Sequence, residues 1–149
     1  MAAKPIPEGY HTVTPCLVAE GAAKLIDFLK QAFGAEERFR MARPDGGVMH
    51  AEVKIGDSMV MLGDANEQWK AMPGVIYLYV DDADAVYRRA LDAGAASVMA
   101  PVDQFYGDRH GGVKDFAGNL WWIGTHKEDV PPDELKRRAE AFMKQPAGP

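Results

Sequence analysis

The sequence predicts an α+β fold: two tandem βαβββ modules whose curved mixed sheets surround a cleft, followed by a C-terminal helix. Two landmarks indicate a duplication. The run His50-Ala-Glu-Val-Lys54 recurs 60 positions later as His110-Gly-Gly-Val-Lys114, and Gly34-Ala35 recurs at the same offset as Gly94-Ala95. The order of patterns repeats as well, because each half reads strand, helix and three further strands. A period of about 60 with two copies exceeds that of common solenoids, so we expect two units packed around one shared cleft.

Length and composition are typical of one globular domain. A chain of 149 residues buries about 70% of its unfolded surface. It has neither an apolar run of about 18 residues nor a charged-then-apolar leader, which predicts no membrane span and no secretory signal. The single cysteine, Cys16, excludes an internal disulfide, and the net charge of -5 disfavours nucleic-acid binding. We therefore expect a cytoplasmic protein with no nucleic-acid or membrane partner.

The first module is predicted at residues 10–64, after an N-terminal arm at residues 1–9. An extended pattern at residues 10–18 contains Pro15, which favours an edge or irregular strand. A helix follows, because apolar residues then recur at helical spacing and Gly34 stands where a left-handed C-terminal cap is needed. Three more strands are expected at residues 36–41, 48–55 and 58–62.

The second module is predicted at residues 74–126 and repeats this order. Residues 75–80 are rich in β-branched and aromatic side chains, which predicts a strand. Asp81 or Asp82 is a suitable N-cap for a helix that ends at Gly94. Three more strands are expected at residues 97–101, 110–115 and 119–125. The two modules together form one predicted domain at residues 10–127.

Residues 128–149 are predicted to form an additional helix and a tail. Pro131 and Pro132 suit the first turn of a helix, and Leu135, Ala139 and Phe142 form its apolar stripe. The first module has no counterpart of this helix. We expect it to cover the sheet or to contact a second copy of the chain, and an interaction module built on this helix is one functional alternative.

Several short motifs make the chain resemble a known superfamily. They are Ile26-Asp27-Phe28, Gly34, Pro44-Asp45-Gly46, Val48-Met49-His50-Ala51-Glu52, Ile55-Gly56-Asp57-Ser58, Gly107-Asp108-Arg109 and the turn from Asp115 to Gly118. In combination they are similar to the vicinal-oxygen-chelate superfamily of glyoxalase I, extradiol dioxygenases and bleomycin-resistance proteins, and within it to the PhnB-like subgroup. The resemblance covers residues 10–127. It implies that each module forms an open trough, that two troughs make a cavity, and that the protein is a homodimer.

The resemblance also implies a position for a divalent metal held by one side chain from each of four strands. The four positions fall on Thr14, Glu52, Val75 and Trp122. Glu is an ordinary metal ligand, whereas Thr is a poor one and Val and Trp offer no coordinating atom. A shift of two residues along the third strand brings in His50 and still supplies one ligand of the four. We therefore expect no metal and no other cofactor, with a divalent ion bound in another way as the alternative.

His50 and Glu52 are the candidate catalytic residues. Alternation along a strand places His50, Glu52 and Lys54 on one face, and Met49 on the apolar face that meets the helix. Such a pair can act as acid and base, or as two members of a metal-binding triad with His110. The alternative is a polar pair lining a wet cavity. Because Gly112 replaces the carboxylate in the second module, we expect any chemistry to depend on the first.

The same alternation predicts an aromatic lining for the trough. It aligns Thr12, Thr14 and Cys16 in the first strand, and it turns Tyr77, Tyr79 and Trp122 toward the trough while Trp121 faces the core. Such a surface suits flat or amphipathic organic molecules, although each aromatic side chain could instead belong to the core between the modules. Arg109, in the polar loop at residues 105–112, either binds a ligand carboxylate or phosphate or braces a turn.

These observations lead to two functional hypotheses. The first is a protein that binds a small aromatic or amphipathic molecule without the usual metal site. The second is a metal-dependent lyase, isomerase or dioxygenase that uses Glu52 and His50. The predicted ligand-binding residues are Thr14, His50, Glu52, Tyr77, Tyr79, Arg109 and Trp122.

Overall fold

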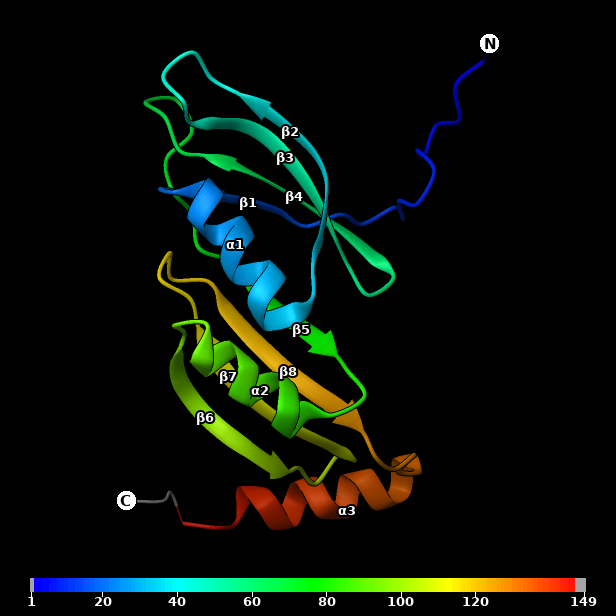
Figure 1. The fold of residues 1–149 in the computed structure, drawn as a ribbon. Helices are drawn as coiled ribbons and strands as arrows, with labels where there is room; N and C mark the ends of the chain where they lie inside the picture. The colour runs from blue at the N-terminus through cyan, green and yellow to red at the C-terminus, as the bar shows by residue number, and fades with distance from the viewer. Residues whose placement is uncertain (1, 147–149) are drawn as a thin grey trace.

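The computed structural model describes residues 2–146 and contains two four-stranded sheets, each packed against one helix (Figure 1). The first sheet has the order β1-β4-β3-β2 and the second the order β5-β8-β7-β6. The first module comprises β1 (Cys16–Ala19), α1 (Ala22–Phe33), β2 (Glu36–Ala42), β3 (Val48–Ile55) and β4 (Ser58–Asp64). The second comprises β5 (Val75–Tyr79), α2 (Ala83–Asp92), β6 (Ala96–Asp103), β7 (Asp108–Lys114) and β8 (Leu120–His126), and α3 (Pro132–Met143) follows. The predicted fold class is confirmed.

The duplication extends to the hydrogen-bonding register. In both sheets the first strand pairs with the last in parallel and the remaining pairs are antiparallel. A β-bulge interrupts β2 between Glu37 and Phe39, and another interrupts β6 between Ser97 and Met99, again 60 positions later. Bulges bend and twist a strand at a fixed place. The two sheets therefore curve at equivalent positions.

Helix α1 forms because its apolar residues return to one side every three or four positions. Leu25, Ile26 and Leu29 are fully buried, and each contributes roughly 1.5–3 kcal/mol on burial. Gly34 ends the helix in the left-handed conformation, at φ 66° and ψ 29°, and its amide donates to the Lys30 carbonyl over 3.1 Å. The predicted C-terminal cap is therefore confirmed.

The two modules share one core on the helix side of the sheets. Helices α1 and α2 pack against each other (Figure 1), and the α2 N-cap is Asp82, whose carboxylate accepts from the Ala85 amide over 3.1 Å. Trp121 of β8 is fully buried, with its ring centroid 5.0 Å from that of Phe33 in α1. The expectation that Trp121 faces the core is correct. This contact fixes the second sheet against the helix of the first module.

The first strand is shorter than predicted. Residues 2–15 form no helix or strand, and β1 begins at Cys16. The Pro15 carbonyl still accepts from the Met61 amide over 2.9 Å, but a proline has no amide proton with which to continue a ladder. The alignment of Thr12 and Thr14 with Cys16 along one strand is therefore wrong.

Met49 is also placed differently from the prediction. It was expected on the apolar face toward the helix, but its exposed fraction is 53%. Met41 pairs with His50 and Ala42 pairs with Val48, so Met49 is the extra residue of a β-bulge. The bulge shifts the alternation by one residue, which buries Val48 instead.

Helix α3 lies across the outer end of the second module (Figure 1). Phe142 packs on Phe105 with ring centroids 5.0 Å apart, and Arg138 donates to the Phe105 carbonyl and to Glu128. No residue of α3 is buried. The helix therefore covers the β6–β7 loop rather than a sheet face. Residue 1 of the predicted arm and residues 147–149 of the predicted tail lie outside the described residues.

None of the described helices is both long and apolar enough to cross a membrane. The longest helices contain 12 residues, whereas a bilayer core requires about 20 apolar residues in helical form.

The β7–β8 turn is held by a buried carboxylate. Asp115 Oδ1 accepts from the amides of Ala117 and Asn119, and Oδ2 accepts from the Asn119 side chain and from Trp121 Nε1 at 2.8 Å. Asn119 in turn accepts from the Gly74 amide at the start of β5. One side chain thus joins the turn, the core tryptophan and the neighbouring strand.

Replacing this carboxylate should destabilise the protein strongly. We expect Asp115→Ala to lower the free energy of unfolding by about 3 kcal/mol, because it leaves several donors unsatisfied in the interior. The matched control is Asp57→Ala in the exposed β3–β4 turn, which should change it by less than about 0.5 kcal/mol. Urea unfolding followed by circular dichroism measures both. Equal effects of the two substitutions would contradict the assigned role of Asp115.

Candidate functional site

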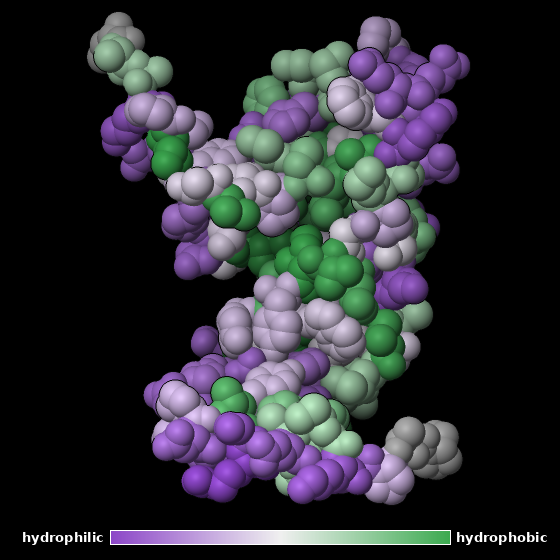
Figure 2. Space-filling model, turned by 180° about the vertical axis from the view of Figure 1, so that it is seen from behind, coloured by the Kyte–Doolittle hydropathy of each residue, from purple (hydrophilic) through white to green (hydrophobic). Residues whose placement is uncertain are grey.

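Each sheet has a face opposite its helix, which we call the open face. Figure 2 shows this side of the molecule, where hydrophobic side chains gather in a central hollow. Residues paired across neighbouring strands share a face. One row on the first open face is Phe39, Glu52, Met61 and Cys16, and the corresponding row on the second is Met99, Gly112, Trp122 and Tyr77. The duplicated strands therefore carry different chemistry at equivalent positions.

Two glycines allow aromatic rings to lie against the second sheet. A β-carbon at Gly112 would lie 2.5 Å from the Trp122 ring, and one at Gly124 would lie 2.5 Å from the Tyr77 hydroxyl. Any other residue at these positions would push the rings away. Glycine at position 112, in place of the carboxylate of Glu52, thus makes room for the indole.

The rings form a continuous surface, which we call the aromatic floor and define as Tyr77, Tyr79, His110 and Trp122. Ring centroids lie 5.0 Å apart for Tyr77 and Tyr79, 5.5 Å for Tyr77 and His110, and 5.2 Å for His110 and Trp122. The exposed fraction is 37% for Tyr77 and 67% for Tyr79, whereas His110 is buried. The tyrosines therefore offer ring surface to solvent.

A buried carboxylate lies beneath the tyrosines. Asp108 is 5% exposed, and its Oδ2 accepts from the hydroxyls of Tyr77 at 2.8 Å and Tyr79 at 3.0 Å. Its Oδ1 lies 2.8 Å from Nδ1 of His126, whose Nε2 lies 2.7 Å from Asp129. The network joins β5, β7, β8 and the segment that leads to α3.

The network shifts the pKa values of its members. Burial alone would raise the pKa of the Asp108 carboxyl, but hydrogen bonds from His126, Tyr77 and Tyr79 outweigh it and lower the pKa. Burial and the hydrogen bond to Asp108 raise the pKa of Tyr77 far above its ordinary value. The hydrogen bonds to Asp108 and Asp129 raise the pKa of His126. The arrangement favours a carboxylate at Asp108, protonated phenols at Tyr77 and Tyr79, and the protonated form of His126, whose two ring nitrogens both contact carboxylate oxygens.

His110 is neutral in this environment. Burial lowers the pKa of its imidazole, and the charge of Asp108 only partly opposes that shift. Its Nδ1 and the Tyr106 hydroxyl are 2.5 Å apart, which fixes the ring orientation. His110 was considered as a third metal ligand, and the structure places it on the open face of the second sheet, among aromatic rings.

His50 and Glu52 lie on the open face of the first module, in β3. His50 Nε2 is 3.5 Å from Glu52 Oε2, and both side chains are partly exposed. A cavity of about 490 Å³ adjoins His50, and its lining includes Cys16, Arg43 and Trp69. The pair can bind or transfer a proton only for a molecule that reaches this face.

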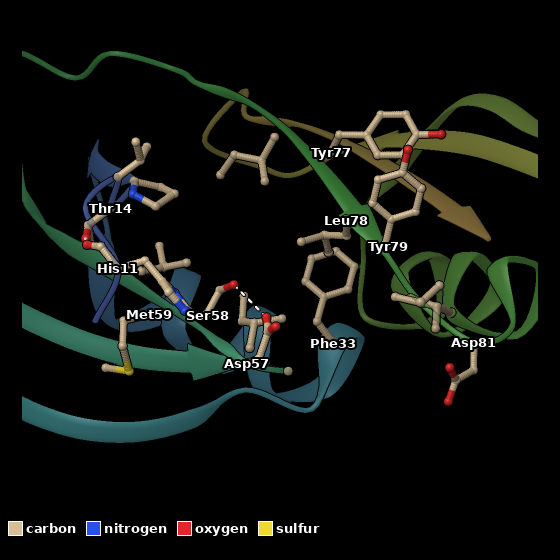
Figure 3. A pocket seen from close by; sticks show the side chains of 18 of the residues that line it. His11, Thr14, Phe33, Asp57, Ser58, Met59, Tyr77, Leu78, Tyr79 and Asp81 are labelled. Atoms are coloured by element: carbon tan, nitrogen blue, oxygen red, sulfur yellow. Dashed lines mark hydrogen bonds between the residues drawn. The ribbon is translucent and has the colours of Figure 1, made fainter. Parts of the chain in front are cut away.

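Thr14 lies in the gap between the modules. This cavity has a volume of about 790 Å³, and Thr14 lines it together with Phe33 and Leu78 (Figure 3). Figure 3 also shows Tyr77 and Tyr79 extending from one face of β5 while Leu78 extends from the other. The Thr14 hydroxyl donates to the His11 carbonyl over 3.3 Å. Tyr77 and Tyr79 line the same cavity, so the structure brings three of the predicted ligand-binding residues together there.

Arg109 lies on the opposite face of β7 from Asp108 and His110. Its guanidinium donates to Asp84 of α2 over 2.6 and 2.9 Å and to Asp103 over 3.2 Å. These contacts tie β7 to α2 and to the end of β6. They correspond to the alternative in which Arg109 braces the structure.

The four positions that the resemblance implied for a metal do not fit one. Thr14 precedes the first strand, Val75 and Trp122 have no coordinating atom, and Glu52 remains the sole ordinary ligand. Within residues 2–146, no group of three His, Cys, Asp or Glu side chains is arranged to hold a metal ion.

Three residues of the Asp108 network were not predicted as site residues. They are Asp108, His126, which lies 18 positions later, and Asp129, which contacts His126. A signal for Asp108 was present, because it shares the alternation of His110 and Gly112 along β7. The contact with His126 depends on the pairing of Asp108 with it across β7 and β8, which the sequence alone does not show.

The pKa of His126 leads to a pH-dependent stability. The unfolded-state pKa of His is about 6.5, and the folded value is raised, so the contribution is fully present below about pH 6.5 and is lost as the pH rises through the folded pKa. We expect the stability difference between the wild type and His126→Gln to shrink over that range. Urea unfolding from about pH 6 to pH 9 measures it. His110 is present in both proteins, so its contribution to the pH dependence cancels in the stability difference. A constant difference would contradict the ion pair.

Comparisons with known proteins agree with this geometry. Residues 10–123 match the model of the Glyoxalase/Bleomycin resistance protein/Dioxygenase superfamily. Uncharacterized protein Mb0911c of Mycobacterium bovis is 41% identical over 135 residues, which cover 83% of this chain and 89% of that protein. Uncharacterized protein Rv0887c of Mycobacterium tuberculosis has the same identity, with 79% of its length covered.

Two solved structures share the fold. TioX from Micromonospora sp. ML1 has a TM-score of 0.68 at 24% identity, covering 78% of this chain and 98% of TioX. The PhnB protein from Bacillus cereus, a putative 3-demethylubiquinone-9 3-methyltransferase, has a TM-score of 0.63 at 20% identity, covering 77% and 99%. At these identities the likeness concerns the fold alone. The family match over residues 10–123 shows that the chain belongs to the glyoxalase/bleomycin resistance protein/dioxygenase superfamily.

Proposed function

We propose that this protein binds a small planar or amphipathic organic molecule on the aromatic floor. The observation that carries the proposal is the seating of Trp122 over Gly112 and of Tyr77 over Gly124. A ligand that stacks on such rings removes apolar surface from water, while a few polar groups orient it. The hydroxyls of Tyr77 and Tyr79, which Asp108 holds in place, are the polar groups proposed to provide that orientation.

We further infer that the protein is a homodimer of the PhnB-like subgroup. Both open faces are uncovered in a single chain, and they carry the exposed side chains of Phe39, Met41 and Val75. Exposed apolar surface of this kind favours association. The subgroup is supported by the motifs at residues 44–52 and 107–109 and by the similarity to the PhnB protein of Bacillus cereus.

Binding can be tested with the neutral, planar dye Nile red. We expect its fluorescence to rise on the wild-type protein and the affinity to fall roughly fivefold or more in Trp122→Ala, because aromatic contacts contribute about 1 kcal/mol beyond their buried area. The control is Trp69→Ala, which removes a tryptophan that is 63% exposed in a loop of the first module. Equal losses in both variants, or no binding to the wild type, would contradict the proposal.

A second candidate is an enzyme that uses His50 and Glu52. The contact of 3.5 Å between them favours it, since a His beside a carboxylate can relay a proton or bind a metal. The reaction would be that of a lyase, isomerase or dioxygenase on a small oxygenated substrate. The surrounding cavity, with Cys16, Arg43 and Trp69, is less aromatic than the floor of the second module.

Elemental analysis separates the two candidates. For protein purified without chelator, the binding proposal predicts a metal content well below one ion per chain, unchanged in Glu52→Ala. A stoichiometric metal that is lost in Glu52→Ala but kept in Glu36→Ala would favour the enzyme instead. Glu36 is a suitable control because its exposed carboxylate lies in the adjacent strand β2.

A further inference from the structure

Asp108 determines which hydrogen-bonding groups the aromatic floor presents to a ligand. A tyrosine hydroxyl has one proton, and an ionised carboxylate only accepts. The hydroxyls of Tyr77 and Tyr79 both donate to Asp108 Oδ2, over 2.8 and 3.0 Å. Each phenol proton is therefore used within the protein, and neither hydroxyl has a proton left to donate to a molecule on the floor. Such oxygens suit a ligand group that is positive or that donates.

The charge around the floor favours the same kind of ligand. His126 contacts the two carboxylates of Asp108 and Asp129, so even with His126 protonated one negative charge is in excess. The arginines of this part of the structure do not offset it, because carboxylates balance their charges. Arg109 contacts Asp84 and Asp103, whereas Arg137 and Arg138 share Glu134 and Arg138 also contacts Glu128.

The hydrogen bonds also change the rings themselves. A phenol that donates to a carboxylate forms a charge-assisted hydrogen bond, which shifts electron density toward its oxygen and ring. A cation is attracted to the face of an aromatic ring by its negative electrostatic potential. Tyr77 and Tyr79 should therefore attract a cation more strongly than isolated tyrosines do.

The geometry leaves room for such a group. The Tyr77 and Tyr79 rings are inclined at 45° with centroids 5.0 Å apart, and both side chains are exposed on the open face. Trp122 lies beyond His110, whose ring centroid is 5.5 Å from that of Tyr77 and 5.2 Å from that of Trp122. The polar tyrosine edge and the apolar indole thus belong to one surface.

Resting on the proposed function, we propose that the aromatic floor selects organic cations. A protonated or quaternary ammonium group of the ligand lies against Tyr77 and Tyr79, and the apolar body of the ligand extends over Trp122. Anionic ligands are disfavoured by the excess negative charge and by the acceptor-only oxygens. Neutral planar molecules gain the stacking on Trp122 and lack the attraction at the tyrosines.

The test compares phenyltrimethylammonium with its uncharged isostere, tert-butylbenzene, by ligand-observed NMR on the full-length protein. The two probes have the same shape, so their difference reports charge. We expect the wild type to bind the cation roughly tenfold more tightly than the neutral probe. In Asp108→Asn the affinity for the cation should fall to about that for the neutral probe, whose own affinity should change by much less. Asp103→Asn is the control, since it removes an equal charge on the helix side of β7.

A second variant keeps the proposal testable if Asp108→Asn does not fold. The double substitution Tyr77→Phe and Tyr79→Phe keeps both rings and leaves Asp108 paired with His126. It should weaken binding of the cation severalfold and binding of the neutral probe by less, because both rings remain. Thermal unfolding by circular dichroism verifies that each variant is folded.

The outcomes separate the two proposals. Equal affinity of the wild type for both probes, or tighter binding of tert-butylbenzene, overturns the cation selectivity and leaves the proposed binding function intact. Binding of neither probe, together with no binding of Nile red, overturns both. A cation preference that persists in Asp108→Asn and in the double variant overturns the assignment to the aromatic floor, and so does one that is lost equally in Asp103→Asn.

Discussion

The burial of Trp121 is the constraint on which the candidate site depends. Its indole packs against Phe33 of α1 and donates to Asp115, so the core of the first module and the last turn of the second meet at one side chain. Successive residues of a strand point to opposite faces. Fixing Trp121 toward the helices therefore fixes Trp122 on the open face. The position of the site follows from the packing of the core.

The two modules kept their backbone and diverged in side chains. The bulges of β2 and β6 are 60 positions apart, so the sheets curve alike, yet Glu52 occurs where the second module has Gly112. A carboxylate gives β3 a polar open face. A glycine lets β7 accept the Trp122 ring. One exchange at an equivalent position thus separates a polar surface from an aromatic one without changing the fold.

The sequence predicts the fold well because its signals are local. Helical spacing, the Gly34 cap and the Asp82 cap each act within a few residues, and the structure confirms them. Met49 was misplaced because a bulge depends on the partner strand. The start of β1 was misplaced because the ladder with β4 begins at Cys16, after Pro15, which has no amide proton. The prediction that Tyr77, Tyr79 and Trp122 lie on one face of the sheet followed from alternation alone. The Asp108 network did not, since it requires knowledge of which strands are neighbours.

The Asp108 network indicates that the second module, rather than the first, determines which kind of ligand is bound. The retained carboxylate of Glu52 had suggested the opposite. At equivalent positions of the first module, Val48 replaces Asp108, Ala65 replaces His126, and the tyrosines become Cys16 and Val18. Burying a carboxylate is costly unless several donors satisfy it, so four polar residues in one cluster stabilise the fold only together. The first module has none of the four, and the polar contact recorded for the partly exposed His50 and Glu52 is the one between them. A preorganised polar cluster beneath exposed rings is the arrangement that orients a ligand with the least rearrangement on binding.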